Sequence, residues 1–223
     1  MGLNLEFMLS IIPELLSAMV ITLQISILAV LLGIMGGLVV GSFRVIGPKW
    51  LKMLIQLLVD YIRGTPQIVH ILIIYFALPR IGIILNAYWT GVVALTIIAT
   101  GYEVEIVRTA IESIDKGQIE AGLAIGLLKR QILIFVLLPQ AIRRIIPPLT
   151  NELTNIVKAS AFLSVIAVNE LTKISNKIIY ETFYFFEVLI LTALIYTVII
   201  TLLGMLSNFI EKRMFSTNSE ANS

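Results

Sequence analysis

Residues 115–139 read DKGQIEAGLAIGLLKRQILIFVLLP and lie between long hydrophobic segments of a 223-residue chain. Charge interrupts this stretch: only eight uncharged residues separate Glu120 from Lys129, whereas a membrane-spanning helix needs about 20 apolar residues. Asp115 and Gln118 have the spacing of a capping box, which predicts a helix start. Each of the two glycines that follow costs a helix about 1 kcal/mol relative to alanine. We therefore expect a short helix at a membrane face that another surface approaches closely.

The same glycines allow two other interpretations. Gly122 and Gly126 have the spacing at which spanning helices pack as a dimer. That pattern needs about 20 apolar residues around it, and the flanking charges deny them. A loop helix without any partner would also fit the spacing. The rest of the chain has to decide between these alternatives and a docking helix.

The composition is that of an integral membrane protein. Of all residues 58% are hydrophobic and 13% are charged, with a mean hydropathy of +0.99, whereas soluble domains carry about 25% charged residues. The net charge of +2 gives no reason to expect nucleic acid as a partner. The chain has no cysteine and one histidine, His70, so disulfides and cysteine or histidine metal clusters are excluded, and we predict no metal site.

Charge-poor segments predict an all-α membrane protein with five transmembrane helices in a single domain, residues 1–215. The predicted spans are residues 15–43, 53–78, 87–111, 143–169 and 188–210, with a loop at 113–139 and a flexible tail at 216–223. Eight Lys and Arg residues fall on one side of these spans and three on the other. The positive-inside rule then places the 113–139 loop and the C-terminus in the cytoplasm and the N-terminus outside.

Charged residues inside the predicted spans are costly and mark functional or structural sites. Asp60 and Arg63 are spaced i, i+3, as are Glu105 and Arg108, which predicts a structural ion pair in each case. Pro66 should break or kink the second span, and the backbone groups it frees must lie in protein or line a wet cavity.

Signs of covalent chemistry are missing from the sequence. There is no GxxxxGK[ST] phosphate loop, no HExxH motif and no defensible set of nucleophile and base. We therefore predict a chain that is not an enzyme. If ATP drives it, another subunit must hydrolyse the ATP, and a cytoplasmic docking helix is what that arrangement would require.

The 115–139 stretch resembles the coupling loop of membrane permease subunits of ABC importers. EAG at 120–122, glycine at 126 and VLLP at 136–139 keep the spacing of Glu-Ala-Ala, three residues, Gly, nine residues, Ile-x-Leu-Pro. Gly122 replaces the second alanine of that pattern and Val136 the isoleucine.

Further motifs are similar to the polar amino-acid subfamily of these permeases, of the histidine, arginine and glutamine type. They are YIRGTP at 61–66, EIVR at 105–108, NE at 151–152 and KAS at 158–160. Ala159 departs from the subfamily, which usually has aspartate there. The resemblance covers about residues 16–210.

The resemblance implies a five-span permease subunit of the bacterial cytoplasmic membrane that works by alternating access. It pairs with a second permease copy, with a homodimer favoured and a heterodimer possible. Two ATP-binding subunits receive the coupling helices, and an extracytoplasmic binding protein delivers a polar amino acid, with a cationic one among the options. ATP and magnesium would bind to the partner ATPase, so no cofactor is expected on this chain. The predicted coupling residues are Glu120, Ala121, Gly122, Ala124 and Gly126.

Polar residues of the broken or striped spans are candidates for substrate contact. They are Thr65, Gln67, Thr100, Glu103, Asn151, Asn155 and Ser160. Glu103 would suit the positive group of a cationic amino acid, and helix–helix packing is the alternative role for each of the seven.

Two other function classes remain open from the residues. An ion-driven carrier or channel would use Asp60, Arg63 and Glu103 as a relay, but it leaves the glycine-bearing loop helix unexplained, and most carriers have more spans or repeats. A membrane scaffold without transport would have no need of costly buried polar groups.

Overall fold

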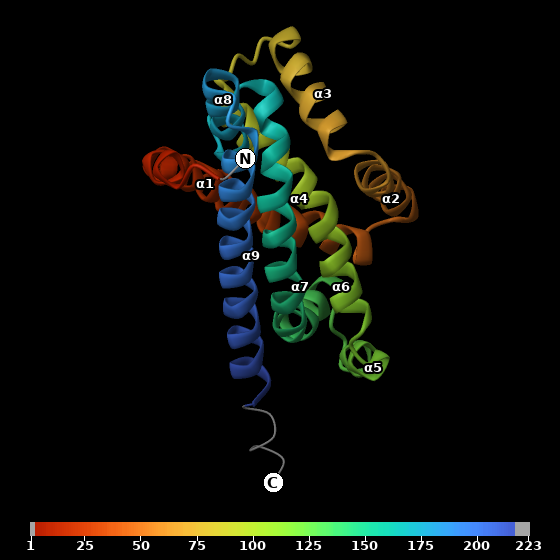
Figure 1. Cartoon of the computed structure of the whole chain (residues 1–223). Coiled ribbons are helices and arrows are strands. Elements are labelled where there is room, and N and C mark those ends of the chain that lie inside the picture. The colour runs from red at the N-terminus through yellow and green to blue at the C-terminus, as the bar shows by residue number, and fades with distance from the viewer. Residues whose placement is uncertain (1–2, 217–223) are drawn as a thin grey trace. The chain divides into compact units, whose positions relative to one another are not determined.

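The computed structural model describes residues 3–216, and every regular element in that range is a helix (Figure 1). The predicted all-α class is therefore confirmed. The predicted tail lies outside the described residues apart from Ser216, which ends the last helix. The α-helices are α1 (Leu5–Ile46), α2 (Lys49–Gly64), α3 (Gln67–Arg80), α4 (Ala87–Glu112), α5 (Lys116–Ala124), α6 (Lys129–Ile132), α7 (Leu138–Ala159), α8 (Leu171–Thr182) and α9 (Phe185–Ser216). A π-helix, Leu133–Leu137, leads into α7, and a 3-10 helix, Ser160–Ile166, follows it.

Several helices are long and apolar enough to cross a membrane, which makes this a multi-pass membrane protein. Within residues 3–216 four stretches qualify, namely Leu5–Ile46, Ala87–Glu112, Lys129–Ile166 and Phe185–Ile210. The number is five if the broken pair α2 and α3 forms one span. The helix α1 begins before the predicted start at residue 15 and includes Glu6 and Glu14. Charge limits the burial of a segment in lipid, but it does not end a helix.

The second predicted span is not one continuous helix, because the chain breaks at Thr65 and Pro66. Thr65 is extended, with φ −115° and ψ 151°, and ends α2. Pro66 is the N-cap residue of α3. It cannot continue the hydrogen bonding of α2, because proline has no N–H to donate. Steric contact with the proline ring keeps the preceding residue out of the helical region, so the Thr-Pro pair explains the break.

The described chain divides into two compact units. The first comprises the residues up to Val30 together with Pro66–Thr96 and Leu153–Gly204. The second comprises Leu31–Thr65, Ile97–Glu152 and the described residues from Met205 onward. The sequence predicts a single domain and carries no linker at these boundaries, because most of them fall inside continuous helices such as α1, α4 and α9.

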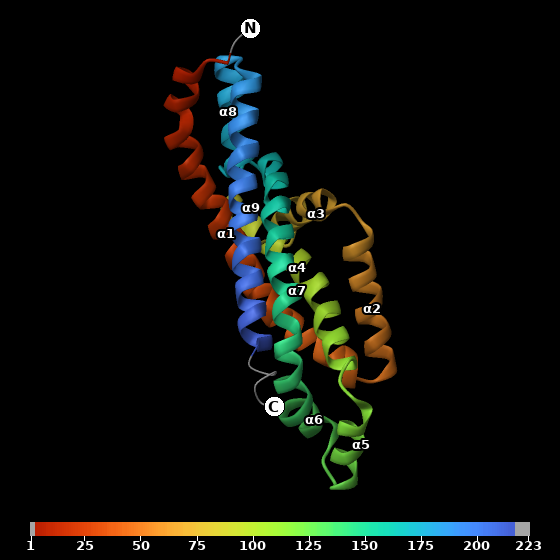
Figure 2. The ribbon, with the colours of Figure 1, turned by 60° about the horizontal axis from the view of Figure 1, so that its bottom comes forward.

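The first unit is organised around α8 and the start of α9, which lie side by side (Figure 2). Its apolar core is formed by Ile11 and Leu15 of α1, Leu171 and Ile178 of α8, and Val188 of α9, with neighbouring side chains. Buried hydrogen bonds join the same helices: the Ser175 and Thr192 hydroxyls lie 2.7 Å apart.

Glu170 caps α8 from a fully buried position. Its Oε1 accepts a hydrogen bond from the Lys173 N–H at 2.6 Å, and its Oε2 accepts from the Thr172 N–H at 2.8 Å and from the Tyr196 hydroxyl at 3.3 Å. Burial raises the pKa of the Glu170 carboxyl from 4.5 to about 7, and the hydrogen bonds only partly offset this. The structure thus keeps a proton on this group at a pH where an ordinary glutamate has lost it.

This burial predicts a pH-dependent stability of the first unit. The folded chain retains the Glu170 proton up to about pH 7, whereas an unfolded glutamate releases it near 4.5, so stability should fall as pH rises between these values. The loss is on the order of 3 kcal/mol. Melting temperatures of the purified protein at pH 5 and pH 8 should differ less in Glu170→Gln than in wild type. Glu181→Gln, at an exposed position of the same helix, is the matched control and should keep the wild-type difference.

The second unit packs the end of α4 against the loop helices and the start of α7. Figure 2 shows α5 and α6 following the end of α4. Val107, Ile111 and Ile114 form one buried cluster with Ile132 and Leu137 and their neighbours. This core fixes the segment that was predicted to dock another protein.

Glycines of α1 allow close contact with α4 in the same unit. A Cβ at Gly33 would lie 2.5 Å from Glu103 Oε2, and one at Gly37 would lie 2.6 Å from Glu103 Cβ. A Cβ at Gly41 would lie 2.9 Å from Val107 Cβ. Real Cβ atoms do not approach other atoms so closely. Along this seam the backbone of α1 at the glycines therefore packs directly against side chains of α4.

Candidate functional site

The loop helix α5 starts where the sequence predicts. Asp115 is extended enough to act as N-cap, with φ −55° and ψ 130°, and its Oδ1 accepts a hydrogen bond from the Gly117 N–H at 2.6 Å. The Gln118 N–H bonds the Asp115 carbonyl at 3.1 Å. This cap satisfies one of the four N–H groups that a helix start leaves without a partner.

Gly126 ends α5 through a left-handed backbone conformation. Its φ is +82°, and its N–H donates to the Leu123 carbonyl at 3.0 Å. The next residue, Leu127, donates its N–H to the Gly122 carbonyl at 3.0 Å. These two bonds are the Schellman motif, in which glycine is favoured because it has no Cβ to clash at positive φ. The shape of the loop thus favours glycine at position 126.

A change at Gly126 should weaken the loop without touching any neighbour, because a Cβ there would meet nothing within 4 Å. Gly126→Val should cost about 1–2 kcal/mol of local stability from the positive φ alone. Gly126→Asn should be tolerated, since asparagine adopts this conformation more readily. Limited proteolysis of the 115–139 loop in the purified protein measures the effect. Equal cleavage of both variants would contradict a conformational role for this glycine.

The faces of α5 differ sharply in exposure. Glu120, Ala121 and Ala124 are exposed, as is Gly126. The side chains of Leu123, Ile125 and Leu128 are also solvent-exposed, at 49%, 77% and 70%. Three apolar side chains beside an exposed glutamate are what a protein-docking surface would present.

Gly122 lies on the opposite, inward face of α5. It is buried, and a Cβ there would lie 2.8 Å from Ile132 Cγ1 and 3.0 Å from Ile132 Cδ1. The close approach that Gly122 allows is therefore to α6 of the same chain. Gly122 therefore supports the exposed face of α5 from behind, because its own side of the helix is covered by Ile132.

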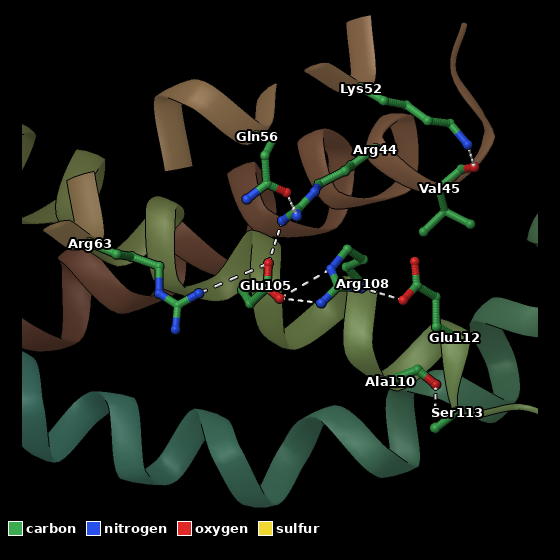
Figure 3. A network of polar contacts seen from close by, with 10 residues as sticks. All are labelled: Arg44, Val45, Lys52, Gln56, Arg63, Glu105, Arg108, Ala110, Glu112 and Ser113. Atoms are coloured by element: carbon green, nitrogen blue, oxygen red, sulfur yellow. Dashed lines mark hydrogen bonds and ion pairs between the residues drawn. The ribbon is translucent and has the colours of Figure 1, made fainter. Parts of the chain in front are cut away.

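A charge network surrounds Glu105 in the second unit (Figure 3). Arg44, at the end of α1, bonds Glu105 Oε2, and Arg108 bonds Oε1 through both Nη2 and Nε, the latter at 3.1 Å. Arg63, at the end of α2, places its Nη1 4.0 Å from Oε2. Glu112 forms a second ion pair with Arg108. One carboxylate thus joins arginines from three helices.

The predicted pairs fare differently in this network. Glu105 and Arg108 form the predicted i, i+3 contact. Asp60 and Arg63 do not: Asp60 Oδ1 accepts from Gln56 Nε2 at 2.6 Å, while Arg63 reaches across to Glu105 on α4. A long arginine side chain at a helix end can reach a neighbouring helix, and sequence spacing within α2 carries no information on that.

A cavity of about 400 Å³ opens between α4, α7 and the end of α2 within the second unit. One wall of the cavity is formed by α4 from Tyr102 onward and by Ser113, which follows it. Another is the face of α7 that carries Arg144, Pro148 and Glu152. Arg63 and Glu105 also line it. At the Ser113 end, Arg144 Nη1 donates to the Ser113 carbonyl at 2.7 Å and to its hydroxyl at 2.6 Å. The cavity is therefore lined by charges of both signs.

The seven predicted substrate residues do not line this cavity, and they divide between the units. Thr65, Thr100, Glu103 and Asn151 belong to the second unit, and Gln67, Asn155 and Ser160 belong to the first. Three of them serve local packing: Ser160 is buried and its hydroxyl donates to the Val157 carbonyl at 2.8 Å, Thr65 donates to the Tyr61 carbonyl at 2.7 Å, and Thr100 faces Gly36 of α1. Asn151 and Asn155 are exposed on α7.

Glu103 is the unusual member of this set, because its side chain is completely buried. Among the described residues neither of its carboxyl oxygens makes a hydrogen bond. Its neighbours across the seam are Gly33 and Gly37. In this conformation the group is closed off from any ligand.

Sequence reasoning singled out Arg63 and Glu105 but missed the residues with which α7 lines the cavity. Arg144, Pro148 and Glu152 are spaced i, i+4, i+8, which places them on one face of α7, and this spacing was readable. Arg44, in contrast, lies 61 positions from its partner Glu105, and no local pattern indicates that pairing. Among the described residues, no cluster of three or more His, Asp or Glu could hold a metal ion.

Known proteins share this architecture and sequence. The model of the family described as "Binding-protein-dependent transport system inner membrane component" matches residues 29–216. A putative glutamine transport system permease protein of Rickettsia bellii is 32% identical over 213 residues, covering 94% of this chain and 98% of that protein. The arginine transport system permease protein ArtQ of Bacillus subtilis is 32% identical over 219 residues, covering 97% of this chain and 100% of ArtQ.

A solved structure agrees with these relatives in fold and in sequence. The crystal structure of an amino acid ABC transporter with histidines superposes on 96% of this chain and 100% of its own, with a TM-score of 0.86 and 34% identity. The family match covers most of the chain, and each of the two relatives aligns over nearly its whole length. The chain therefore belongs to the family of binding-protein-dependent transport system inner membrane components.

Proposed function

We propose that this chain is the permease subunit of an ATP-driven importer that carries a polar amino acid across the bacterial cytoplasmic membrane by alternating access. The observation that carries the proposal is α5: a helix capped at both ends that exposes Glu120 and Leu123, with Ile125 and Leu128 exposed directly after it. The names of the relatives, which specify glutamine and arginine transport, support a polar amino acid as the substrate.

The ATPase activity belongs to a partner in this proposal. Two ATP-binding subunits, with ATP and magnesium, dock on the exposed face formed by Glu120, Ala121, Ala124 and the apolar side chains beside them. Gly122 and Gly126 hold that face in shape. A second permease copy, identical or related, completes the pathway, and an extracytoplasmic binding protein delivers the substrate.

The membrane topology follows the sequence in this proposal. The chain forms a single permease domain with five spans, the broken pair α2 and α3 supplying the second, and the α5 loop lies in the cytoplasm together with the C-terminus.

Reconstitution tests the proposal directly. The permease, co-purified with its ATP-binding partner subunits, should take up labelled glutamine or arginine into vesicles when ATP and the binding protein are supplied. Uptake that needs an ion gradient and no ATPase would instead show the alternative, an ion-driven carrier. In the control complex, Leu123→Asp and Ile125→Asp replace two exposed apolar side chains of the loop. This variant should lose the ATPase subunit during purification.

A further inference from the structure

Arg63 belongs to the charge network around Glu105 but makes no hydrogen bond to that carboxylate. Both oxygens of Glu105 are already engaged, Oε2 by Arg44 and Oε1 by Arg108. Arg63 Nη1 is 4.0 Å from Oε2, which is beyond hydrogen-bond range. Within the described residues the Arg63 guanidinium donates no hydrogen bond, so its five donors are available to a ligand.

The position of Arg63 directs these donors into the cavity. Its side chain is 42% exposed, and its Cζ lies 5.7 Å from the ring centroid of Tyr102. Both residues line the cavity of about 400 Å³. A ring face under a guanidinium holds its plane in place, which reduces the freedom lost when the fork binds a ligand.

Arg144, the second arginine that lines the cavity, already donates hydrogen bonds to Ser113. Arg144 holds the Ser113 carbonyl and hydroxyl, and so caps the C-terminal end of α4, where a cation is favourable. Arg63 is therefore the cation of the cavity wall that no described group holds by a hydrogen bond. Glu152 supplies an acidic group on the α7 side of the same wall.

We infer that Arg63 binds the carboxylate of the transported amino acid in this cavity, and this inference rests on the proposed function. Guanidinium and carboxylate match as two parallel hydrogen bonds. Arg44 and Arg108 neutralise Glu105, so that carboxylate does not compete for the Arg63 fork. Glu152 faces the cavity where the ligand's ammonium group would lie. The site thus binds the carboxylate and the ammonium group that all amino acids share. Other contacts would recognise the side chain of the ligand.

A comparison of ligand and residue changes tests this role. The permease–ATPase complex, in phosphatidylcholine nanodiscs and without binding protein, is titrated with L-glutamine, L-arginine and their two carboxamides by calorimetry. Wild type should bind the preferred amino acid at least about 10-fold more tightly than its amide, the usual value of a hydrogen bond to a charged group. Arg63→Gln should remove this difference and leave binding of the amide unchanged. Arg63→Lys, which keeps the charge and loses the fork, should retain part of it.

The control and the contrary outcomes are distinct. Arg143→Gln, an exposed arginine of α7 that does not line the cavity, should behave as wild type. Equal binding of acid and amide by wild type, a full difference in Arg63→Gln, or equal loss of both ligands in that variant would each overturn the inference. The proposed function fails separately, if the wild-type complex shows no ATP-dependent uptake of either amino acid into vesicles.

Discussion

Replacing Gly122 with leucine is expected to abolish ATP-dependent uptake while the chain still reaches the membrane. The position is buried against α6, and even a Cβ would lie 2.8 Å from Ile132 Cγ1. A leucine has three further carbon atoms to place, so α5 must tilt away from α6. Overpacking of this kind costs about 1–3 kcal/mol, and the tilt displaces every docking side chain at once. The measurement is uptake into vesicles together with ATP hydrolysis by the bound partner.

A compensating pair of substitutions identifies the cause of that loss. Gly122→Ala should reduce uptake, and Ile132→Ala in the same chain should restore part of it by removing Cγ1 and Cδ1, the two nearest atoms. Recovery would locate the contact inside this chain. If the double variant is no better than Gly122→Ala alone, Gly122 instead touches the ATPase subunit, and our assignment of its face is wrong.

Loss of the Glu105 charge is expected to destabilise the second unit more than loss of any other single carboxylate. Arg44, Glu105 and Arg108 have side chains only 9%, 20% and 27% exposed. Glu105→Gln leaves the poorly solvated Arg44 without a carboxylate partner and leaves Arg108 with only the more exposed Glu112. Breaking a buried pair costs about 3–5 kcal/mol, and the partial exposure here reduces this to about 2–3 kcal/mol. The melting temperature of the detergent-solubilised protein should fall accordingly.

Glu112→Gln is the matched control for this substitution. Glu112 also pairs with Arg108, but its side chain is 53% exposed, and such surface pairs contribute about 0–1 kcal/mol. Its melting temperature should remain close to that of wild type. Equal effects of the two substitutions would show that the network around Glu105 is no more than a set of surface ion pairs.

Much of this fold could be predicted from residues close in sequence. The charge-free runs indicate the long helices, Asp115 marks the start of α5, and Pro66 marks the break between α2 and α3. Each of these features depends on local chemistry: the hydration of charge, the capping of a helix start, and the missing N–H of proline. Family resemblance then extends the loop motif to a proposed partner.

The candidate site could not be predicted in the same way, because it depends on contacts between distant segments. The i, i+3 rule identifies Glu105 with Arg108, but it fails for Asp60 and Arg63, since the arginine reaches a different helix. In the sequence, Gly122 fits the pattern of a docking residue. Only the contact with Ile132 in the structure shows that it faces α6. Hydrophobic periodicity says that a face is buried, but it does not say what covers it.

The glycine seam between α1 and α4 has a mechanical consequence for the second unit. Gly33, Gly37 and Gly41 set the distance between the helices by the atoms that they lack. This spacing cannot be adjusted gradually, because a Cβ at any of the three glycines would force α1 and α4 apart. When α4 is displaced, α1 must travel with it, or the Glu103 carboxyl loses its cover. Within this unit the two helices are therefore one moving part, and any rearrangement has to take place at its outer surfaces.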